Sequence, residues 1–203
     1  PMGSISISKT KTGELEFDYT RFDQIAQVFW DTKKMNYIET GELAKFTSGG
    51  FASTGIDFKD FSVKNSETGD KITMKGGDVI PQLLPAFESH LRQKGWLNKT
   101  FFHIKDEPSH HNAPDWIKAS SYVHQYAPEL TRLDALTTSF VLEDIEIAVP
   151  KLDHLDAGYE VYRKWQEKGN ELWFYTVGIY QGSLLPNKTI DVPLVCCIQF
   201  VPP

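Results

Sequence analysis

The segment 100–108, TFFHIKDEP, joins a short apolar run to two adjacent carboxylic acids and a proline. Its first six residues, through the lysine, predict a buried strand. Upstream, Leu84, Phe87 and Leu91 recur at helical spacing. That helical pattern ends at Gly95, and glycine commonly terminates helices. A helix therefore leads into this strand.

The same order of elements occurs again near the end of the sequence. Tyr159, Tyr162 and Trp165 form a second helical stripe, which a Lys-Gly pair closes at Gly169. The run LWFYTV, residues 172–177, then predicts another strand. A helix, a Lys-Gly pair and a strand thus follow one another twice.

Further helices are predicted over residues 19–31 and 116–126, and further strands over residues 35–39, 133–138 and 145–149. Helices that alternate with short apolar strands are typical of a parallel α/β sheet buried on both faces. A closed (β/α)8 TIM barrel needs eight strands and about 250 residues. With five strands in 203 residues, we expect an open doubly wound sheet or a partial barrel.

Residues 49–78 interrupt this pattern with a segment rich in Gly, Ser, Thr and Asp. The stretches IDFKDFSV and KITM flank residues 65–70, NSETGD, which predicts a β-hairpin inserted in a long loop. We expect residues 1–14 to be a tag remnant or an N-terminal arm. Residues 15–203 are expected to form one truncated domain of the barrel type.

Composition narrows the classes of partner. The chain has 27 acidic and 21 basic residues, a formal net charge of -6, which argues against binding to nucleic acid or anionic lipid. It has no run of about 18 apolar residues, so no membrane span is expected. A small neutral or polar ligand fits this composition better.

Cysteines and histidines provide no metal site and no cofactor site. Cys196 and Cys197 are adjacent, so they cannot readily form an ordinary disulfide, and they indicate neither a zinc site nor a compartment. His110 and His111 lack the spacing of a helical metal site and have no obvious third ligand. We therefore expect no metal and no cofactor.

The candidate site follows from the position of polar residues after the strands, because ligands of parallel sheets bind beyond the carboxyl ends of the strands. Glu39 follows the first strand, and Asp106 and Glu107 follow the second. Adjacent acids repel, which raises the pKa of one of them toward the range of a general acid. A solvated loop start is the alternative for this pair.

Consecutive side chains on a strand point to opposite faces, so Asp106 and Glu107 are poorly placed to act as acid and nucleophile across one glycosidic bond. A substrate that carries its own nucleophile, such as a 2-acetamido oxygen, removes this difficulty. Glu107 would then protonate the leaving oxygen while Asp106 orients the amide. Four aromatic residues offer faces for a sugar ring, although core packing is the alternative for the first of them: Trp173, Tyr175, Tyr37 and Phe140.

Several segments in order carry a resemblance to a known family. They are GWL at 95–97, HIKDEP at 103–108, NELWFYT at 170–176, and PN at 186–187 with IDVPL at 190–194. Over about residues 15–195 the chain resembles the catalytic domain of glycoside hydrolase family 123 and its uncharacterised relatives, the domain of unknown function 4091 family.

The resemblance implies a (β/α) barrel and a retaining exo-β-N-acetylgalactosaminidase that uses substrate-assisted catalysis on a glycan with a terminal 2-acetamido sugar. Glu107 matches the general acid/base, and Asp106 matches the residue that stabilises the oxazolinium intermediate. The residues that match the loop bordering the sugar are Tyr175, Gln181, Asn187 and Asp191.

The chain also departs from the family pattern. Family members continue after the IDVPL segment with an Arg- and Trp-containing helix and a last strand, whereas this chain continues with residues 195–203, VCCIQFVPP. The first two barrel strands and a preceding β-sandwich are not evident either. A non-catalytic carbohydrate-binding or interaction module is therefore the alternative, and open sheet edges would favour self-association. A secreted or periplasmic location is left open.

Overall fold

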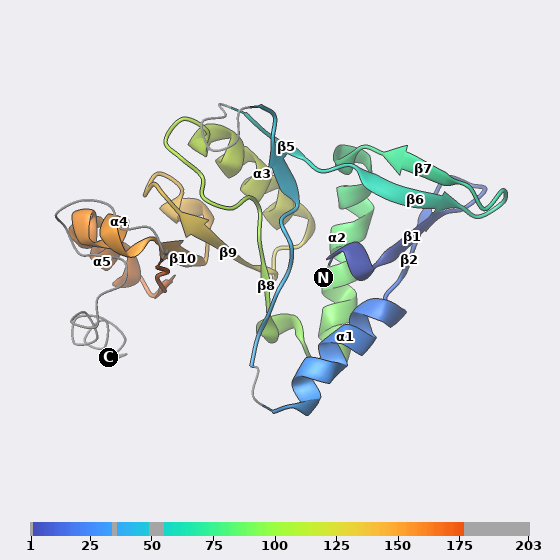
Figure 1. The fold of residues 1–203 in the computed structure, drawn as a ribbon, viewed down its shortest axis with the longest axis horizontal. Coiled ribbons are helices and arrows are strands. Elements are labelled where there is room, and N and C mark those ends of the chain that lie inside the picture. Colours follow the sequence, from blue (N-terminus) through green and yellow to red (C-terminus); the bar gives the residue numbers. More distant parts are fainter. Residues whose placement is uncertain (1, 34–35, 49–54, 177–203) are drawn as a thin grey trace.

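The computed structural model describes residues 2–33, 36–48 and 55–176, and its central feature is a five-stranded parallel sheet (Figure 1). The strand order is β11-β10-β9-β8-β3, and every pair is parallel. The five strands are β3 (Ile38–Glu39), β8 (Thr100–Phe102), β9 (Thr131–Leu136), β10 (Ile147–Pro150) and β11 (Glu171–Leu172). All five predicted strands are confirmed, with shifted or shorter bounds.

The order of the strands bears on whether the sheet is doubly wound or part of a (β/α) barrel, the two architectures that the sequence predicts. The strands of this sheet lie side by side in the order in which they occur along the chain, although β4 to β7 intervene between β3 and β8. A doubly wound sheet instead reverses its order at a switch point. Sequential order is that of a (β/α) barrel. The sheet is open over the described residues, however, so the class observed is α/β with a parallel sheet, and the barrel stays a prediction.

The helices that the sequence predicts are confirmed. They are α1 (Thr20–Asp31), α2 (Gly76–Lys94), α3 (Ala113–Tyr126) and α5 (Tyr159–Gln166), with a short α4 (Leu152–Ala157) before the last. Gly95 adopts the left-handed conformation, φ 68°, and its N–H bonds back to the end of α2. In the described part of the chain, the single-turn 3-10 helices are η1 (Met2–Ser4), η3 (Leu97–Lys99) and η4 (Leu142–Asp144). None of the helices in the described ranges is long and apolar enough to cross a bilayer.

A second sheet of four strands lies at the opposite end of the molecule from α4 and α5 (Figure 1). Its order is β2-β1-β6-β7, and its members are β1 (Ser6–Lys9), β2 (Leu15–Asp18), β6 (Phe61–Asn65) and β7 (Lys71–Met74). The predicted hairpin is thus confirmed as β6 and β7, but it pairs with β1 instead of standing alone. The predicted strand IDFKDFSV is divided, because β5 (Ile56–Phe58) pairs with β4 (Ala44–Phe46).

The two faces of the parallel sheet differ. One face contributes to the main core, where Phe87 of α2, Phe102 of β8 and Trp116 of α3 are fully buried. The other face carries a small cluster around Leu133 and Val149. This second face borders the cavity that contains the candidate site.

Candidate active site

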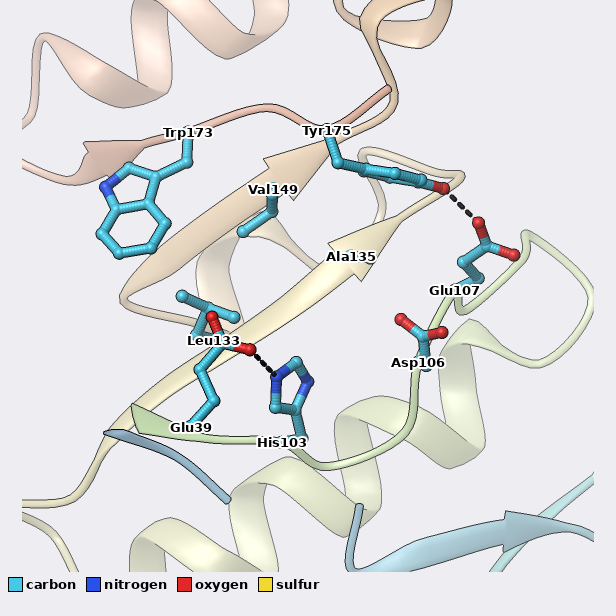
Figure 2. A pocket seen from close by; sticks show the side chains of 9 residues that line it. All are labelled: Glu39, His103, Asp106, Glu107, Leu133, Ala135, Val149, Trp173 and Tyr175. Atoms are coloured by element: carbon cyan, nitrogen blue, oxygen red, sulfur yellow. Dashed lines mark hydrogen bonds and ion pairs between the residues drawn. The ribbon is translucent and has the colours of Figure 1, made fainter. Parts of the chain in front are cut away.

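A cavity of about 310 Å³ lies over the second face, where the parallel strands end (Figure 2). Its wall combines acids, one imidazole, two aromatic rings and three aliphatic side chains. The lining residues are Glu39, His103, Asp106, Glu107, Leu133, Ala135, Val149, Trp173 and Tyr175.

Asp106 and Glu107 reach this cavity from a turn beyond β8. The strand ends at Phe102, earlier than predicted, so strand alternation does not govern the two acids. Glu107 has a positive φ of 50°, which residues other than glycine rarely adopt, and its N–H donates to the carbonyl oxygen of Ala135 at 2.9 Å. The expectation that the two side chains point to opposite faces is therefore wrong, because both line one cavity (Figure 2).

Tyr175 holds the carboxyl group of Glu107. Its hydroxyl donates a hydrogen bond to Oε1 of Glu107 across the cavity (Figure 2). The backbone of Tyr175 is fixed by Pro150, whose carbonyl accepts the Tyr175 N–H, and by Leu152, whose N–H donates to the Tyr175 carbonyl. Burial and then the bond to Glu107 raise the pKa of the Tyr175 hydroxyl well above its ordinary value. The phenol therefore keeps its proton and acts as a donor.

Asp106 stands in an acidic environment. Burial first, and then the negative charges of Glu107 and Asp134, raise the pKa of the Asp106 carboxyl, while Lys105 opposes the rise. The predicted repulsion between the two adjacent acids is thus present, although it is secondary to burial and raises the pKa of Asp106.

Glu42 stabilises the turn that carries Asp106 and Glu107. Its Oε1 accepts hydrogen bonds from the Asp106 N–H at 3.2 Å and from the ammonium group of Lys105 at 2.6 Å. Its Oε2 accepts one from Lys59 at 3.0 Å. The two lysines outweigh the effect of burial and lower the pKa of Glu42, so it is an ionised acceptor. Glu42 ties the backbone of Asp106 to the segment between β3 and β4.

Asp134 of β9 is a second anchor, and it is fully buried. Its Oδ2 accepts hydrogen bonds from the N–H groups of Ile104 and Lys105 at 3.0 and 3.1 Å, and from the indole N–H of Trp116 at 3.1 Å. The residues just before the two acids are thereby fixed to the sheet. A charged residue inside an apolar strand is a sequence signal for such a role, and Asp134 was nevertheless not among the predicted residues.

His103 lies between Asp134 and Glu39. Its Nδ1 is 2.7 Å from Oδ1 of Asp134, and its Nε2 is 3.3 Å from Oε2 of Glu39. Burial lowers the pKa of the ring, but the bonds to the two carboxylates outweigh it and raise the pKa to about 10. His103 was not predicted to belong to the site because the predicted strand extended to Lys105, which made His103 a strand residue instead of one that follows a strand.

Of the other aromatic candidates, Trp173 and Tyr37 lie at or beside the cavity, and Phe140 does not line it. Trp173 lines the cavity and packs edge-on against Phe101 at a centroid distance of 5.4 Å, so it contributes to both the site and the small cluster. Tyr37 lies beside the cavity, stacked on Phe101 at 4.8 Å and 6.3 Å from Trp173. Phe140 is 68% exposed and does not line the cavity.

Three predicted residues, Gln181, Asn187 and Asp191, lie outside the described residues. Within the described ranges, no group of three or more His, Cys, Asp or Glu side chains is arranged to hold a metal ion. The rings of His110 and His111 contact each other, with centroids 3.7 Å apart.

The fold and the cavity define an α/β protein that carries paired acids at the carboxyl edge of a parallel sheet, where α/β enzymes have their active sites. The family model "Glycoside hydrolase 123, catalytic domain" matches residues 2–197, so the chain belongs to this family.

Comparison with solved structures shows a similar fold. The structure of a family 123 glycoside hydrolase from Clostridium perfringens, analysed for the details of glycolipid glycan hydrolysis, has a TM-score of 0.61 and 20% sequence identity. The match covers 88% of this chain and 33% of that enzyme, so the chain spans about a third of its length. No match was found among curated proteins.

Proposed function

We propose that the protein is a retaining exo-β-N-acetylgalactosaminidase that removes a terminal 2-acetamido sugar from a glycan. The observation that carries the proposal is the convergence of Asp106 and Glu107 on one cavity (Figure 2). The cavity volume of about 310 Å³ supports a small ligand, since small-molecule sites measure about 300–1,000 Å³. Membership of glycoside hydrolase family 123 supports the reaction class.

The positions of the two acids favour substrate assistance over direct displacement. In ordinary retaining enzymes the acid and the nucleophile stand about 5–5.5 Å apart across the scissile bond. Asp106 and Glu107 are consecutive and enter the cavity from one turn, so they cannot flank a sugar from opposite sides. The nucleophile is then the carbonyl oxygen of the substrate's own acetamido group, a recognised exception among glycosidases.

The reaction has two steps on this proposal. Glu107 transfers its proton to the glycosidic oxygen, the bond from C1 to that oxygen breaks, and the acetamido oxygen bonds to C1 to give an oxazolinium ion. Asp106 accepts a hydrogen bond from the amide N–H and offsets the developing positive charge. Water then attacks C1, Glu107 takes the proton from that water, and the oxazolinium ring opens. Two inversions at C1 retain the β configuration.

The neighbouring residues have supporting roles. The hydroxyl of Tyr175 fixes the orientation of the Glu107 carboxyl group, which must reach the glycosidic oxygen. Trp173 and Tyr37 offer ring faces, and Glu39 offers a carboxylate, at or beside the same cavity. We include Gln181, Asn187 and Asp191 in the sugar site on the family pattern alone. The sequential strand order supports a (β/α) barrel as the complete architecture.

Substitution of Glu107 by Gln tests the proposal. The full-length protein should release nitrophenol from the nitrophenyl β-N-acetylgalactosaminide and not from the β-galactoside, because the second substrate lacks the acetamido nucleophile. With an unactivated disaccharide as substrate, Glu107→Gln should lower kcat by about 10²- to 10⁴-fold, the usual contribution of general acid-base catalysis.

A matched control is Glu143→Gln, because Glu143 is exposed and pairs with Lys168 on the surface. It should retain native activity. Sugar binding without turnover by the native full-length protein would instead favour the non-catalytic binding module. Equal hydrolysis of the galactoside would overturn substrate assistance.

A further inference from the structure

Several carboxyl groups surround His103 at the edge of the cavity. Glu39 approaches it from β3, Asp134 from β9, and Asp106 and Glu107 line the same cavity from the turn that follows His103. The ammonium group of Lys105 is directed to Glu42 instead. The imidazole therefore connects a buried carboxylate to one that faces the cavity.

The two carboxylates differ in exposure. The side chain of Asp134 is fully buried, whereas that of Glu39 is 55% exposed and that of His103 is 15% exposed. Asp134 is also fixed by the backbone N–H groups of Ile104 and Lys105. The His103 ring therefore joins a carboxylate that is fixed to one that is accessible.

We propose that His103, anchored by Asp134, is a positioning residue that holds the Glu39 carboxylate at the cavity to accept hydrogen bonds from the hydroxyl groups of the bound sugar. This inference rests on the proposed function and adds to it a recognition group and the residue that orients it. Glu39 and the catalytic turn share one anchor, because Asp134 fixes both His103 and the backbone leading to Asp106.

The charge state of Glu39 suits this role. The hydrogen bond from His103 outweighs burial and lowers the pKa of Glu39, so the carboxylate is ionised at neutral pH. An ionised carboxylate is an acceptor without a proton of its own, and it forms stronger hydrogen bonds with hydroxyl groups than a neutral acceptor does. One carboxylate can therefore bind two neighbouring hydroxyl groups of a pyranose.

A double-mutant cycle tests whether His103 acts through Glu39. The full-length protein, Glu39→Gln, His103→Gln and the double variant are compared by steady-state kinetics on nitrophenyl β-N-acetylgalactosaminide and by the affinity for free N-acetylgalactosamine. Glu39→Gln should weaken binding by about 10- to 100-fold, as expected for hydrogen bonds to a charged group, with the loss in KM and not in kcat. His103→Gln should weaken sugar binding by a smaller factor.

The inference requires that the two losses do not multiply. If His103 acts only by positioning Glu39, the double variant binds no more weakly than Glu39→Gln alone. Losses that multiply would overturn the inference, since they would indicate independent roles. The matched control is His90→Gln, because His90 also bonds a carboxylate, that of Asp23 at 2.7 Å, but joins α1 and α2 away from the cavity. Its KM and kcat should remain native.

A second measurement avoids dependence on folded variants. In the native protein, saturating N-acetylgalactosamine should shift the ring nitrogen resonances of His103 more than those of His90. Equal shifts with proven binding would overturn the inference and leave the proposed function intact. A native protein that neither binds nor hydrolyses the sugar would overturn the proposed function, and this inference with it.

Discussion

On the proposed mechanism, Asp106 must be ionised to accept the amide N–H of the substrate, yet its surroundings favour the protonated form. Burial and the charges of Glu107 and Asp134 raise its pKa above the ordinary value of 3.8. Activity that needs ionised Asp106 is lost as the pH falls through this raised pKa. We therefore expect the acidic limb of the pH profile of kcat/KM to lie above pH 3.8.

The pH profile is measured across the acidic and neutral range, with circular dichroism at each pH to separate inactivation from unfolding. Because the two acids interact, the limb reports the pair and not one residue. An acidic limb of the profile at or below pH 3.8 would contradict a raised pKa of Asp106.

The charge of His103 should contribute to stability in a pH-dependent manner. Its pKa rises from 6.5 to about 10 on folding, through its bonds to Asp134 and Glu39. The stabilisation is complete below pH 6.5, declines as the pH rises, and is lost as the pH passes through about 10. Within this window the loss is at most about 1.4 kcal/mol per pH unit.

Denaturant unfolding at several pH values checks this expectation. The difference in unfolding free energy between the native protein and His103→Gln should narrow as the pH is raised from below 6.5 toward about 10. A difference that is independent of pH would mean that the ring is not charged in the folded state.

The secondary structure that the sequence predicts best has strong local signals. The stripe Leu84, Phe87 and Leu91 with its terminal Gly95 defines α2, because helix periodicity and a left-handed terminal glycine are both local properties. By contrast, β1 lies in residues 6–9, SISK, where alternation is weak and the partners are β2 and β6. Its pairing with β6, which is distant in the sequence, cannot be predicted from this local pattern.

The same distinction applies to the candidate site. Asp106 and Glu107 are evident from the sequence because two acids directly follow an apolar run. The positive φ of Glu107 and the contact with Tyr175, 68 residues later in the chain, depend on how the turn packs against β9 and the segment after β11. Sequence alternation alone therefore predicted opposite faces for side chains that share a cavity.

The close packing of the start of α2 against the end of β5 requires a glycine. A Cβ atom on Gly76 would lie 2.5 Å from the carbonyl oxygen of Lys59 and 2.5 Å from Cβ of Phe58, closer than packed atoms tolerate. Gly76→Ala should therefore destabilise the fold by about 1–3 kcal/mol, the usual cost of overpacking.

The adjacent glycine provides the control. Gly77 lies in the same helical turn, and a Cβ there would meet nothing within 4 Å. Gly77→Ala should stabilise the protein by up to about 1 kcal/mol, because alanine loses less backbone entropy in a helix. Denaturation midpoints measure both variants, and equal effects would contradict the contact at Gly76.

At the level of the molecule, Glu42 links the turn that carries the paired acids to the segment that leads into the four-stranded sheet. The Glu42 carboxylate accepts hydrogen bonds from Lys105 and from the Asp106 N–H next to the cavity. It also accepts one from Lys59, which precedes β6. The four-stranded sheet is thereby connected to the turn that carries the paired acids. The N-terminal part of the chain thus contributes a group that supports the candidate site, although the four-stranded sheet shares no strand with the parallel sheet.

The charge of the whole molecule should select neutral substrates. The chain carries a formal net charge of -6, and the cavity wall includes three acids, Glu39, Asp106 and Glu107, against one cation, the ring of His103. Charges of one sign in a cavity lower the local concentration of ligands of the same sign. The full-length protein should therefore hydrolyse the neutral nitrophenyl β-N-acetylgalactosaminide with a higher kcat/KM than the same substrate with a sulfate on its primary hydroxyl group.

Ionic strength separates this field from a steric effect of the sulfate group. The Debye length falls from about 30 Å at 0.01 M salt to about 3 Å at 1 M, so salt screens the field of distant charges. The ratio of kcat/KM for the neutral substrate to that for the sulfated one should therefore decrease as salt is raised. A ratio that stays constant would mean that the sulfate group is excluded by shape, and a ratio below one would mean that a cation of the cavity, such as His103, dominates recognition.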